Sequence, residues 1–596
     1  MLKKFLWGAL SSFVGAWVAL ALFVGLAVVV VIGIIGGIAS QGEPAGISKG
    51  SILTVELNGP VSEIAVTPDF NYMDIVNGGI TRSQSLLELT TAIKEAADNK
   101  HIAAIYLKCG GISASPATLN AIRKALVDFR KSGKPVYAFG ESYSTADYYV
   151  ASCADRIYAN PSGMISLHGI GSTSIYMKNL FDKLGVSFQV VKVGKFKSAV
   201  EPYILEHMSE PARAQIDTLF NNMWGYIAGA IADARKLKSS SSIDSLIGRD
   251  YIMYAPMDEC RRAGLVDSLV YERQVDGILA DLVGKKKDDL NFVAPAALTA
   301  QTDWGMEYGS KKQIALLYAV GEIIDQGGNG TIDYTSLVPQ IVKLAEDDNV
   351  KGMVLRVNSP GGSAFGSDQI GEALDYFMSK GKKLAVSMGD YAASGGYWIS
   401  SCADIIYADA LTITGSIGIF GLIPNVKGLT DKLGVNFESV NTVPGSDFPT
   451  LFAPLTETQQ AVMQKYVERG YDQFVSRVAK GRHLSKERVR QIGEGRVWDA
   501  MSAVKIGLVD SIGGIDNAVR WVASKSGLGG SYDVAVYPKA ESSIWDFIPA
   551  TGLNVLEESL YGALEPGASK WVARLGAALL RQTPVQARMM PVRVTL

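Results

Sequence analysis

The chain has 596 residues, of which 48% are hydrophobic, so it is long and apolar enough to bury more than one core and is not globally disordered. Its 57 lysines and arginines nearly balance its 59 aspartates and glutamates, and no long basic run occurs. Nucleic acid is therefore excluded as the expected partner.

The first predicted element is a membrane anchor. Lys3 and Lys4 precede an uncharged apolar stretch at residues 5–39, and about 20 apolar residues suffice to cross a lipid bilayer. The positive-inside rule then leaves the N-terminus in the cytoplasm. A cleaved signal peptide is the alternative, because A-x-A-like patterns occur in the stretch, but its apolar region normally spans only about 7 to 15 residues. We expect a single-pass protein of the cytoplasmic (inner) membrane, with its catalytic domains on the periplasmic or extracytoplasmic side.

The chain beyond the anchor contains an internal sequence repeat. Residues 140–158 resemble residues 389–407, and the cysteines of their shared S-C-A-D motif are 402 − 153 = 249 positions apart. The same offset relates F-D-K-L-G-V-S-F at 181–188 to T-D-K-L-G-V-N-F at 430–437. A repeat of this length predicts two similar domains. The resulting division is an anchor and linker at 1–45, a first repeat at 46–290, a linker at 291–312, a second repeat at 313–545 and a C-terminal tail at 546–596.

Strands alternate with helices in each copy. Apolar strand-like runs occur in the same order in both, at 51–57, 102–107 and 136–139 and again at 313–318, 350–357 and 384–388. This alternation is typical of βαβ units around a largely parallel sheet, in which sites gather at the carboxyl ends of strands. In the second copy, N-S-P-G-G at 358–362 and G-D-Y-A-A-S-G-G at 389–396 follow two such strand ends.

The two copies keep complementary reactive residues. Ser394 of the second copy falls opposite Thr145 of the first, while Lys197 of the first falls opposite Ser446 of the second, since 446 − 197 = 249. A serine is a weak nucleophile without an adjacent base. The reciprocal pattern therefore predicts one site that is completed across the two halves.

The sequence offers other motifs and bases for this serine. The α/β-hydrolase elbow G-x-S-x-G is excluded, because Ala392 stands where it requires glycine. The four histidines are scattered, and His168 falls opposite Ile417, which favours a packing or surface role over a catalytic one. A lysine can act as base where burial lowers its pKa. The apolar neighbourhood of Lys197 favours this role, and a solvent-exposed lysine, like Lys192 and Lys195, is the alternative.

Glycines near Ser394 suit an oxyanion hole. The backbone N–H of Gly361 or Gly362 can point into a cleft without a side chain in the way, and the N–H of Gly395 can supply a second donor at the start of a helix. An ordinary tight turn is the alternative for S-P-G-G taken alone.

Several motifs together carry a resemblance to a known family. They are F-K-S-A-V-E-P-Y around Lys197, N-S-P-G-G-S, A-A-S-G-G-Y-W-I-S around Ser394 and T-I-T-G-S-I-G-I-F-G around Ser416. With the anchor and the tandem halves, the chain closely resembles the long form of the signal peptide peptidase A (protease IV) family over nearly its whole length.

The resemblance implies an α/β fold with one Clp protease/crotonase-like domain of ββα-type units in each half. It implies a membrane-anchored serine endopeptidase with Ser394 as nucleophile, Lys197 as general base, Ser416 orienting the lysine, and Gly362 and Gly395 donating to the oxyanion. No metal or cofactor is implied. The expected partners are cleaved signal peptides and other short apolar peptides, the lipid bilayer through residues 5–39, and further copies of the chain in a homo-oligomer, commonly a tetramer. A crotonase-like acyl-binding protein and a catalytically inactive membrane scaffold are the alternatives.

Overall fold

The computed structural model describes residues 46–64, 83–250, 255–299, 312–327, 330–530, 532–538 and 585–588. The predicted anchor at 5–39 and most of the tail at 546–596 lie outside these ranges. Among the helices within them, none is long and apolar enough to cross a membrane.

The first half contains a parallel sheet in the order β10-β1-β3-β4-β6-β9, with β2 paired to β1. Its strands are β1 (Ser51–Ser62), β2 (Gln84–Ser85), β3 (Ile102–Ser113), β4 (Val136–Gly140), β6 (Arg156–Ala159), β9 (Ser268–Leu269) and β10 (Phe292–Val293). A small separate pair is formed by β5 (Tyr143–Ser144) and β7 (Ile165–Ser166). The helices are α3 (Leu86–Asp98), α4 (Pro116–Arg130), α5 (Thr145–Ala151), α6 (Lys178–Leu184), α7 (Glu201–Ile204), α8 (Glu210–Ala234), α9 (Ser240–Asp250), α10 (Met257–Arg262), α11 (Glu272–Val283) and α12 (Pro295–Thr299).

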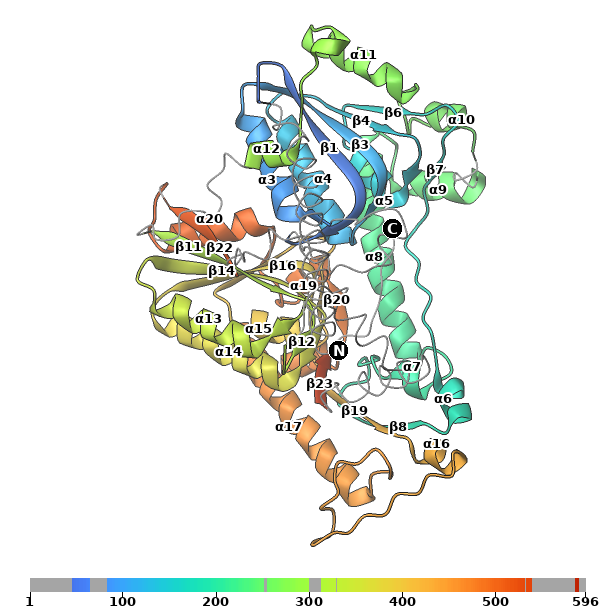
Figure 1. Cartoon of the computed structure of the whole chain (residues 1–596), viewed down its shortest axis with the longest axis vertical. Helices are drawn as coiled ribbons and strands as arrows, with labels where there is room; N and C mark the ends of the chain where they lie inside the picture. Colours follow the sequence, from blue (N-terminus) through green and yellow to red (C-terminus); the bar gives the residue numbers. More distant parts are fainter. Residues whose placement is uncertain are drawn as a thin grey trace, which may run out of the picture.

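The second half repeats this plan in the order β20-β18-β16-β14-β11-β22, with β17 paired to β16 and β21. Its strands are β11 (Gln313–Val320), β14 (Val350–Ser359), β16 (Lys383–Ala393), β17 (Ile405–Ala408), β18 (Ile413–Gly415), β20 (Val497–Asp499), β21 (Ser511–Ile512) and β22 (Asp533–Tyr537). Its helices are α13 (Tyr334–Glu346), α14 (Ala364–Ser379), α15 (Gly395–Ser400), α16 (Lys427–Lys432), α17 (Glu457–Gly481), α18 (Lys486–Ile492), α19 (Ala500–Lys505) and α20 (Ile515–Lys525). The predicted tandem α/β organisation is therefore present (Figure 1).

Both faces of each sheet are covered, which explains the nearly continuous apolar runs. On β11, Ala315 and Leu317 face the core beneath α13 and α14, while Ile314 and Leu316 face a second core beneath α20. Successive side chains of a strand point to opposite faces, so a parallel strand covered by helices on both sides needs apolar residues at every position.

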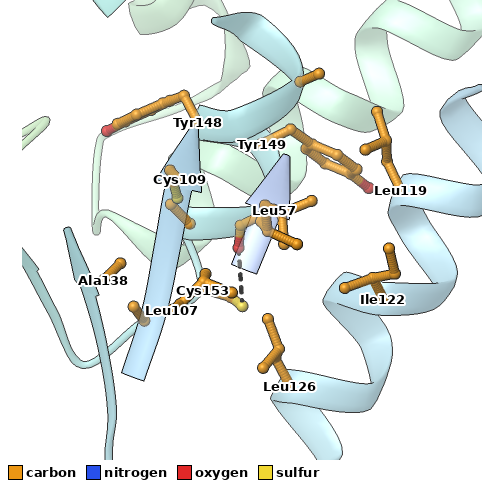
Figure 2. Close-up of a cluster of buried hydrophobic side chains, with 14 of the residues drawn as sticks. Leu57, Leu107, Cys109, Leu119, Ile122, Leu126, Ala138, Tyr148, Tyr149 and Cys153 are labelled. Atoms are coloured by element: carbon orange, nitrogen blue, oxygen red, sulfur yellow. Dashed lines mark hydrogen bonds between the residues drawn. The ribbon is translucent and has the colours of Figure 1, made fainter. Parts of the chain in front are cut away.

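The repeated cysteine motif belongs to the core. Cys153 is 1% exposed and its Sγ lies 3.2 Å from the Val150 carbonyl oxygen. Figure 2 shows it among apolar side chains of β1, β3 and α4, including Leu57, Leu107 and Leu126. The sulfurs of all four cysteines are free thiols. Cys153 therefore acts as a small packing residue.

A third sheet joins the halves. Its order is β13-β12-β15-β23-β19-β8, in which β8 comes from the first half and its partner β19 from the second. The bounds are β8 (Ser187–Lys192), β12 (Ile323–Ile324), β13 (Ile332–Asp333), β15 (Gly361–Ser363), β19 (Phe420–Asn425) and β23 (Val585–Arg588). Figure 1 shows β8, β19 and β23 together at the lower part of the molecule, beyond the body of the first half.

The expected linker at 291–312 begins inside the first domain. Phe292 and Val293 pair with Ile52 and Leu53 of β1 and form the edge of the first sheet. Val293 is 1% exposed, as is expected of an apolar residue paired at a covered sheet edge. The linker boundary drawn from the Ala/Pro composition was therefore wrong for these residues.

Candidate active site

Ser394 lies at the turn between a strand and a helix. β16 ends at Ala393 and α15 begins at Gly395, so the serine is the N-terminal cap residue of α15. Its φ of 55° and ψ of −114° are unfavourable for a residue with a side chain. Backbone hydrogen bonds hold this conformation: Ser394 N–H donates to the Gly415 carbonyl at 2.8 Å, and Trp398 N–H donates to the Ser394 carbonyl at 2.8 Å.

Lys197 reaches the second half because the strand before it, β8, pairs with a strand of that half. The antiparallel pairing of β8 with β19 aligns Lys192 with Phe420, and the chain then continues into the loop that contains Lys197. Phe196 N–H donates to the Glu494 carbonyl at 3.0 Å, which anchors the loop beside the second domain. A lysine of the first repeat thereby becomes part of a site in the second.

The lysine and the serine meet. Lys197 Nζ lies 2.7 Å from Ser394 Oγ, 3.1 Å from Ser416 Oγ and 3.2 Å from the Ser416 carbonyl oxygen. Lys197 Nζ donates to these three oxygens, and an amine without its extra proton has a lone pair that can accept from the Ser394 hydroxyl instead.

Burial controls the charge of the lysine. Lys197 is 1% exposed, and Ser394 and Ser416 are 0% and 1% exposed. Removal from water disfavours the ammonium ion, so the pKa of Lys197 lies well below the ordinary lysine value. Burial is the cause identified for this lowering, with no charged neighbour contributing to it. The site therefore favours an uncharged amine beside the serine.

Two glycines make room for the lysine side chain. A Cβ on Gly495 would lie 2.6 Å from Lys197 Cβ, and a Cβ on Gly418 would lie 3.2 Å from Lys197 Cδ. Neither glycine was singled out from the sequence. Gly418 ends the motif G-S-I-G at 415–418, two residues after Ser416, and this was the available signal for it; no local pattern indicates that Gly495 lies near Lys197.

The glycines proposed for the oxyanion hole belong to β15, which contains Gly361 and Gly362, and to α15, which begins at Gly395 and packs against β15. Ser359, which precedes the glycine pair, aligns with Ala392 of β16, and a Cβ on Gly396 would lie 2.7 Å from the Ser359 carbonyl oxygen. The N–H of Gly361 donates to Ser359 Oγ at 3.2 Å, which leaves Gly362 as the better candidate of the pair. Gly395 is the first residue of α15, and the first amides of a helix have no partner within the helix.

Thr145 and Ser446, which stand opposite Ser394 and Lys197 in the repeat alignment, do not form a second site. The hydroxyl of Thr145 donates to the Ser166 carbonyl at 2.9 Å and lies against backbone groups. Ser446 is exposed, and its hydroxyl donates to Val443 O at 2.8 Å within its own loop. His168 is also exposed. The structure brings together Lys197, Ser394 and Ser416, and it does not bring Thr145 or Ser446 into a comparable arrangement.

A buried polar contact fixes the position of one half against the other. Glu63, which follows β1, accepts from Arg356 of β14 at 2.8 and 3.0 Å and from the Asn358 side-chain amide at 3.0 Å. Glu63 and Arg356 are 4% and 6% exposed. A paired and hydrogen-bonded buried ion pair of this kind specifies one geometry, because either charge alone would be costly. The sequence reading did not identify this pair.

Comparison with known proteins identifies the family of the chain. The model of peptidase family S49 matches residues 128–285 and 376–529, one region in each half. Protease 4 of Haemophilus influenzae is 36% identical over 451 residues, which cover 74% of this chain and 73% of the relative. Protease 4 of Salmonella typhi is 37% identical, over 74% of this chain and 72% of the relative.

A more distant relative spans a larger share of the chain. The chloroplastic serine protease SPPA of Arabidopsis thaliana is 26% identical over 87% of this chain and 76% of the relative. The two family regions, taken with the identity to two proteins called protease 4, establish the family predicted from the motifs. The chain belongs to peptidase family S49 and is a serine-type protease.

Proposed function

We propose that Ser394 and Lys197 form a catalytic dyad shared between the two halves, and that the dyad hydrolyses peptides through an acyl-enzyme. The observation that carries this proposal is the 2.7 Å approach of Lys197 Nζ to Ser394 Oγ in a buried site. A nucleophile within hydrogen-bond reach of a base that is itself oriented by a third group is the arrangement covalent catalysis requires. Ser416 is the orienting group.

The reaction follows from these positions. Neutral Lys197 takes the proton of the Ser394 hydroxyl as its oxygen attacks the scissile carbonyl, and the N–H groups of Gly362 and Gly395 stabilise the resulting oxyanion. The lysine then gives its proton to the leaving amine as the C–N bond breaks, which leaves an ester on Ser394. Water, deprotonated by the same lysine, attacks the ester and releases the second product.

The proposed substrates are remnant signal peptides and other short apolar peptides, and we propose endopeptidase cleavage. The family resemblance and the predicted anchor at residues 5–39 support this choice. We further propose that residues 5–39 hold the protein in the cytoplasmic membrane with both halves on the extracytoplasmic side, and that the protein is a homo-oligomer, a tetramer by the same resemblance. A membrane-attached enzyme of this orientation meets signal peptides where they remain after secretion.

The competing functions explain less of the site. A crotonase-like acyl-binding protein needs the two backbone donors but neither the serine nor the lysine. An inactive scaffold does not explain a buried lysine, because removing the lysine from water costs folding free energy. Perturbed titratable groups of this kind gather at functional sites.

Hydrolysis of a short apolar peptide by the full chain in detergent tests the proposal. Ser394→Ala and Lys197→Ala are each expected to lower kcat/KM by at least about 10³-fold, because loss of one member of a catalytic unit removes most of the activity of the whole unit. Lys195→Ala is the matched control, since this lysine is 64% exposed and pairs with Glu494 at the surface. Normal activity of Lys197→Ala in a folded protein would refute the dyad.

A further inference from the structure

A buried amide, Gln215, joins the loop of Lys197 to a strand of the other half. Gln215 lies on α8 and is 4% exposed. Its Nε2 donates to the Phe196 carbonyl at 3.1 Å and to Ser198 Oγ at 3.3 Å. Its Oε1 accepts from the Val497 N–H at 3.2 Å. One side chain therefore binds the residues on both sides of Lys197 and also a residue of β20.

The strand that Gln215 reaches supports the opposite side of the site. Val497 of β20 is the antiparallel partner of Gly415 of β18. The Gly415 carbonyl accepts from the Ser394 N–H at 2.8 Å, and the residue after Gly415 is Ser416. The amide thus links the loop of the proposed base to the strand pair that holds the proposed nucleophile and the serine that orients the lysine.

The peptide group that leads into Lys197 is fixed by this amide. The Phe196 N–H donates to the Glu494 carbonyl at 3.0 Å, and the Phe196 carbonyl accepts from Gln215. A buried polar group is costly to leave without a partner, so the loop is held firmly in this place. Rates depend steeply on such placement, because a shift of about 1 Å in a reacting group can cost about 10²-fold.

The fold itself does not require an amide at this position. The two halves have equivalent helices, α8 and α17, each of 25 residues and each capped by a hydroxyl side chain, Ser209 and Thr456. Six positions after its cap, α8 has Gln215 and α17 has Val462, which is 58% exposed. The buried amide therefore belongs to the half that supplies the lysine.

We infer that Gln215 is a positioning residue for the proposed base: its amide holds the Lys197 loop against β20 and keeps the lysine directed at Ser394. The inference rests on the proposed function, because it takes Lys197 as the base. An amide suits this place because it donates and accepts at once and carries no charge. Gln215 and Lys197 line the same small cavity, so a carboxylate at position 215 would favour the ammonium form of the lysine.

The variant Gln215→Met tests the positioning role, since methionine fills a similar volume without the amide. For the full chain in detergent, we expect kcat to fall by about 10- to 10²-fold and KM to stay within about twofold, because substrate contacts are unchanged. Asn222→Met is the matched control. Asn222 also lies on α8 and donates to Asp499 of β20 at 2.9 Å, but no hydrogen bond joins it to the Lys197 loop in the described part of the chain. A parent-like kcat for Gln215→Met, or an equal loss in Asn222→Met, would overturn the inference.

A pH profile separates an effect on the base from a merely structural role. Gln215→Glu keeps the shape of the side chain and an oxygen for the Val497 N–H. The rising limb of its kcat/KM is expected to move upward by about one pH unit, because a nearby negative charge raises the pKa of a lysine. Gln215→Met is expected to keep the limb of the parent chain. Should the methionine variant not fold, the glutamate variant still decides, since an unchanged limb would show that residue 215 does not act on the base.

Labelling of Ser394 by a serine-directed phosphonate distinguishes failure of the inference from failure of the proposed function. Slow labelling in both Lys197→Ala and Gln215→Met supports the two together. Slow labelling in Lys197→Ala with a parent-like rate in Gln215→Met overturns the positioning role alone. A parent-like rate in Lys197→Ala refutes the dyad, and the role of Gln215 falls with it.

Discussion

Lys197 Nζ lies 2.7 Å from Ser394 Oγ although 197 residues separate the two in the chain. The contact exists because β8 leaves the first domain and pairs with β19 of the second, which carries the following loop to the carboxyl end of β16. The contact therefore joins a residue of the first half to a residue of the second.

Lys197→Met is expected to abolish peptidase activity and to stabilise the protein by about 1–2 kcal/mol, the usual range where a site strained for function is relieved. Folding at neutral pH must either remove the lysine proton or bury its charge, and both cost free energy. Methionine fills a similar volume without that cost. Thermal unfolding of the two proteins measures the difference. A lower midpoint for the variant would show that the lysine is a net stabiliser.

The activity is expected to rise with pH as Lys197 loses its proton. Burial lowers the pKa of Lys197, so the rising limb of kcat/KM should lie well below the ordinary lysine value of about 10.4. Lys197→Arg, which stays protonated, should be inactive throughout. A profile of kcat/KM against pH, with circular dichroism confirming that the protein stays folded, measures this. A limb centred near pH 10 would contradict a buried base.

Gly495→Ala is expected to lower kcat by about 10²-fold or more, because its Cβ would displace Lys197 from 2.6 Å away. Gly434→Ala is the matched control: its φ of 71° resembles the 78° of Gly495, but a Cβ there meets nothing within 4 Å. Both substitutions carry the left-handed backbone penalty of about 1–2 kcal/mol. Steady-state kinetics of the folded variants separate them, and equal activities would show that Gly495 does not position the lysine.

Asp409→Asn is expected to stabilise the protein only at higher pH. Burial raises the pKa of Asp409 to about 6, opposed by hydrogen bonds from the Leu411 amide and the Asn120 side chain of the other half. A carboxyl with a raised folded pKa contributes stability that is complete below its unfolded pKa of about 3.9 and is lost as pH rises through 6. The amide does not titrate.

The unfolding free energies of the parent and of Asp409→Asn should therefore diverge between about pH 4 and pH 6, with the variant gaining on the parent as pH rises. Denaturant titrations at pH 4, 5, 6 and 7 follow the gap. Arg356 and Asp390, which also act on the Asp409 carboxyl, are present in both proteins. A constant gap across this range would show that Asp409 titrates in the folded protein as it does in the unfolded chain.

The sequence predicted what local pattern and repetition encode. Alternating apolar runs located the strands, and the one-to-one offset paired Ser394 with Thr145 and Lys197 with Ser446, which suggested a divided site. The pairing of β8 with β19 was not predictable, because pairing between distant strands leaves no local periodicity in the sequence of either strand. The Glu63–Arg356 pair was also not predictable, because its members are 293 residues apart and share no local pattern.

Other misses have more specific causes. The short strand at Phe292–Val293 was read as a linker because two apolar residues next to an Ala/Pro stretch carry too little pattern to indicate a strand. The strand at 585–588 has the sequence V-Q-A-R, which resembles no regular element by itself. Its pairing depends on main-chain groups, and these are the same in every sequence.

Labelling by a serine-directed phosphonate, followed by peptide mass spectrometry, tests the shared dyad most directly. The probe reports the nucleophile itself and does not depend on the choice of substrate. We predict modification of Ser394 in the parent chain and a rate at least about 10²-fold lower in Lys197→Ala, as expected on removal of a general base. Equal labelling rates in the two proteins, or modification of a serine other than Ser394, would contradict the account.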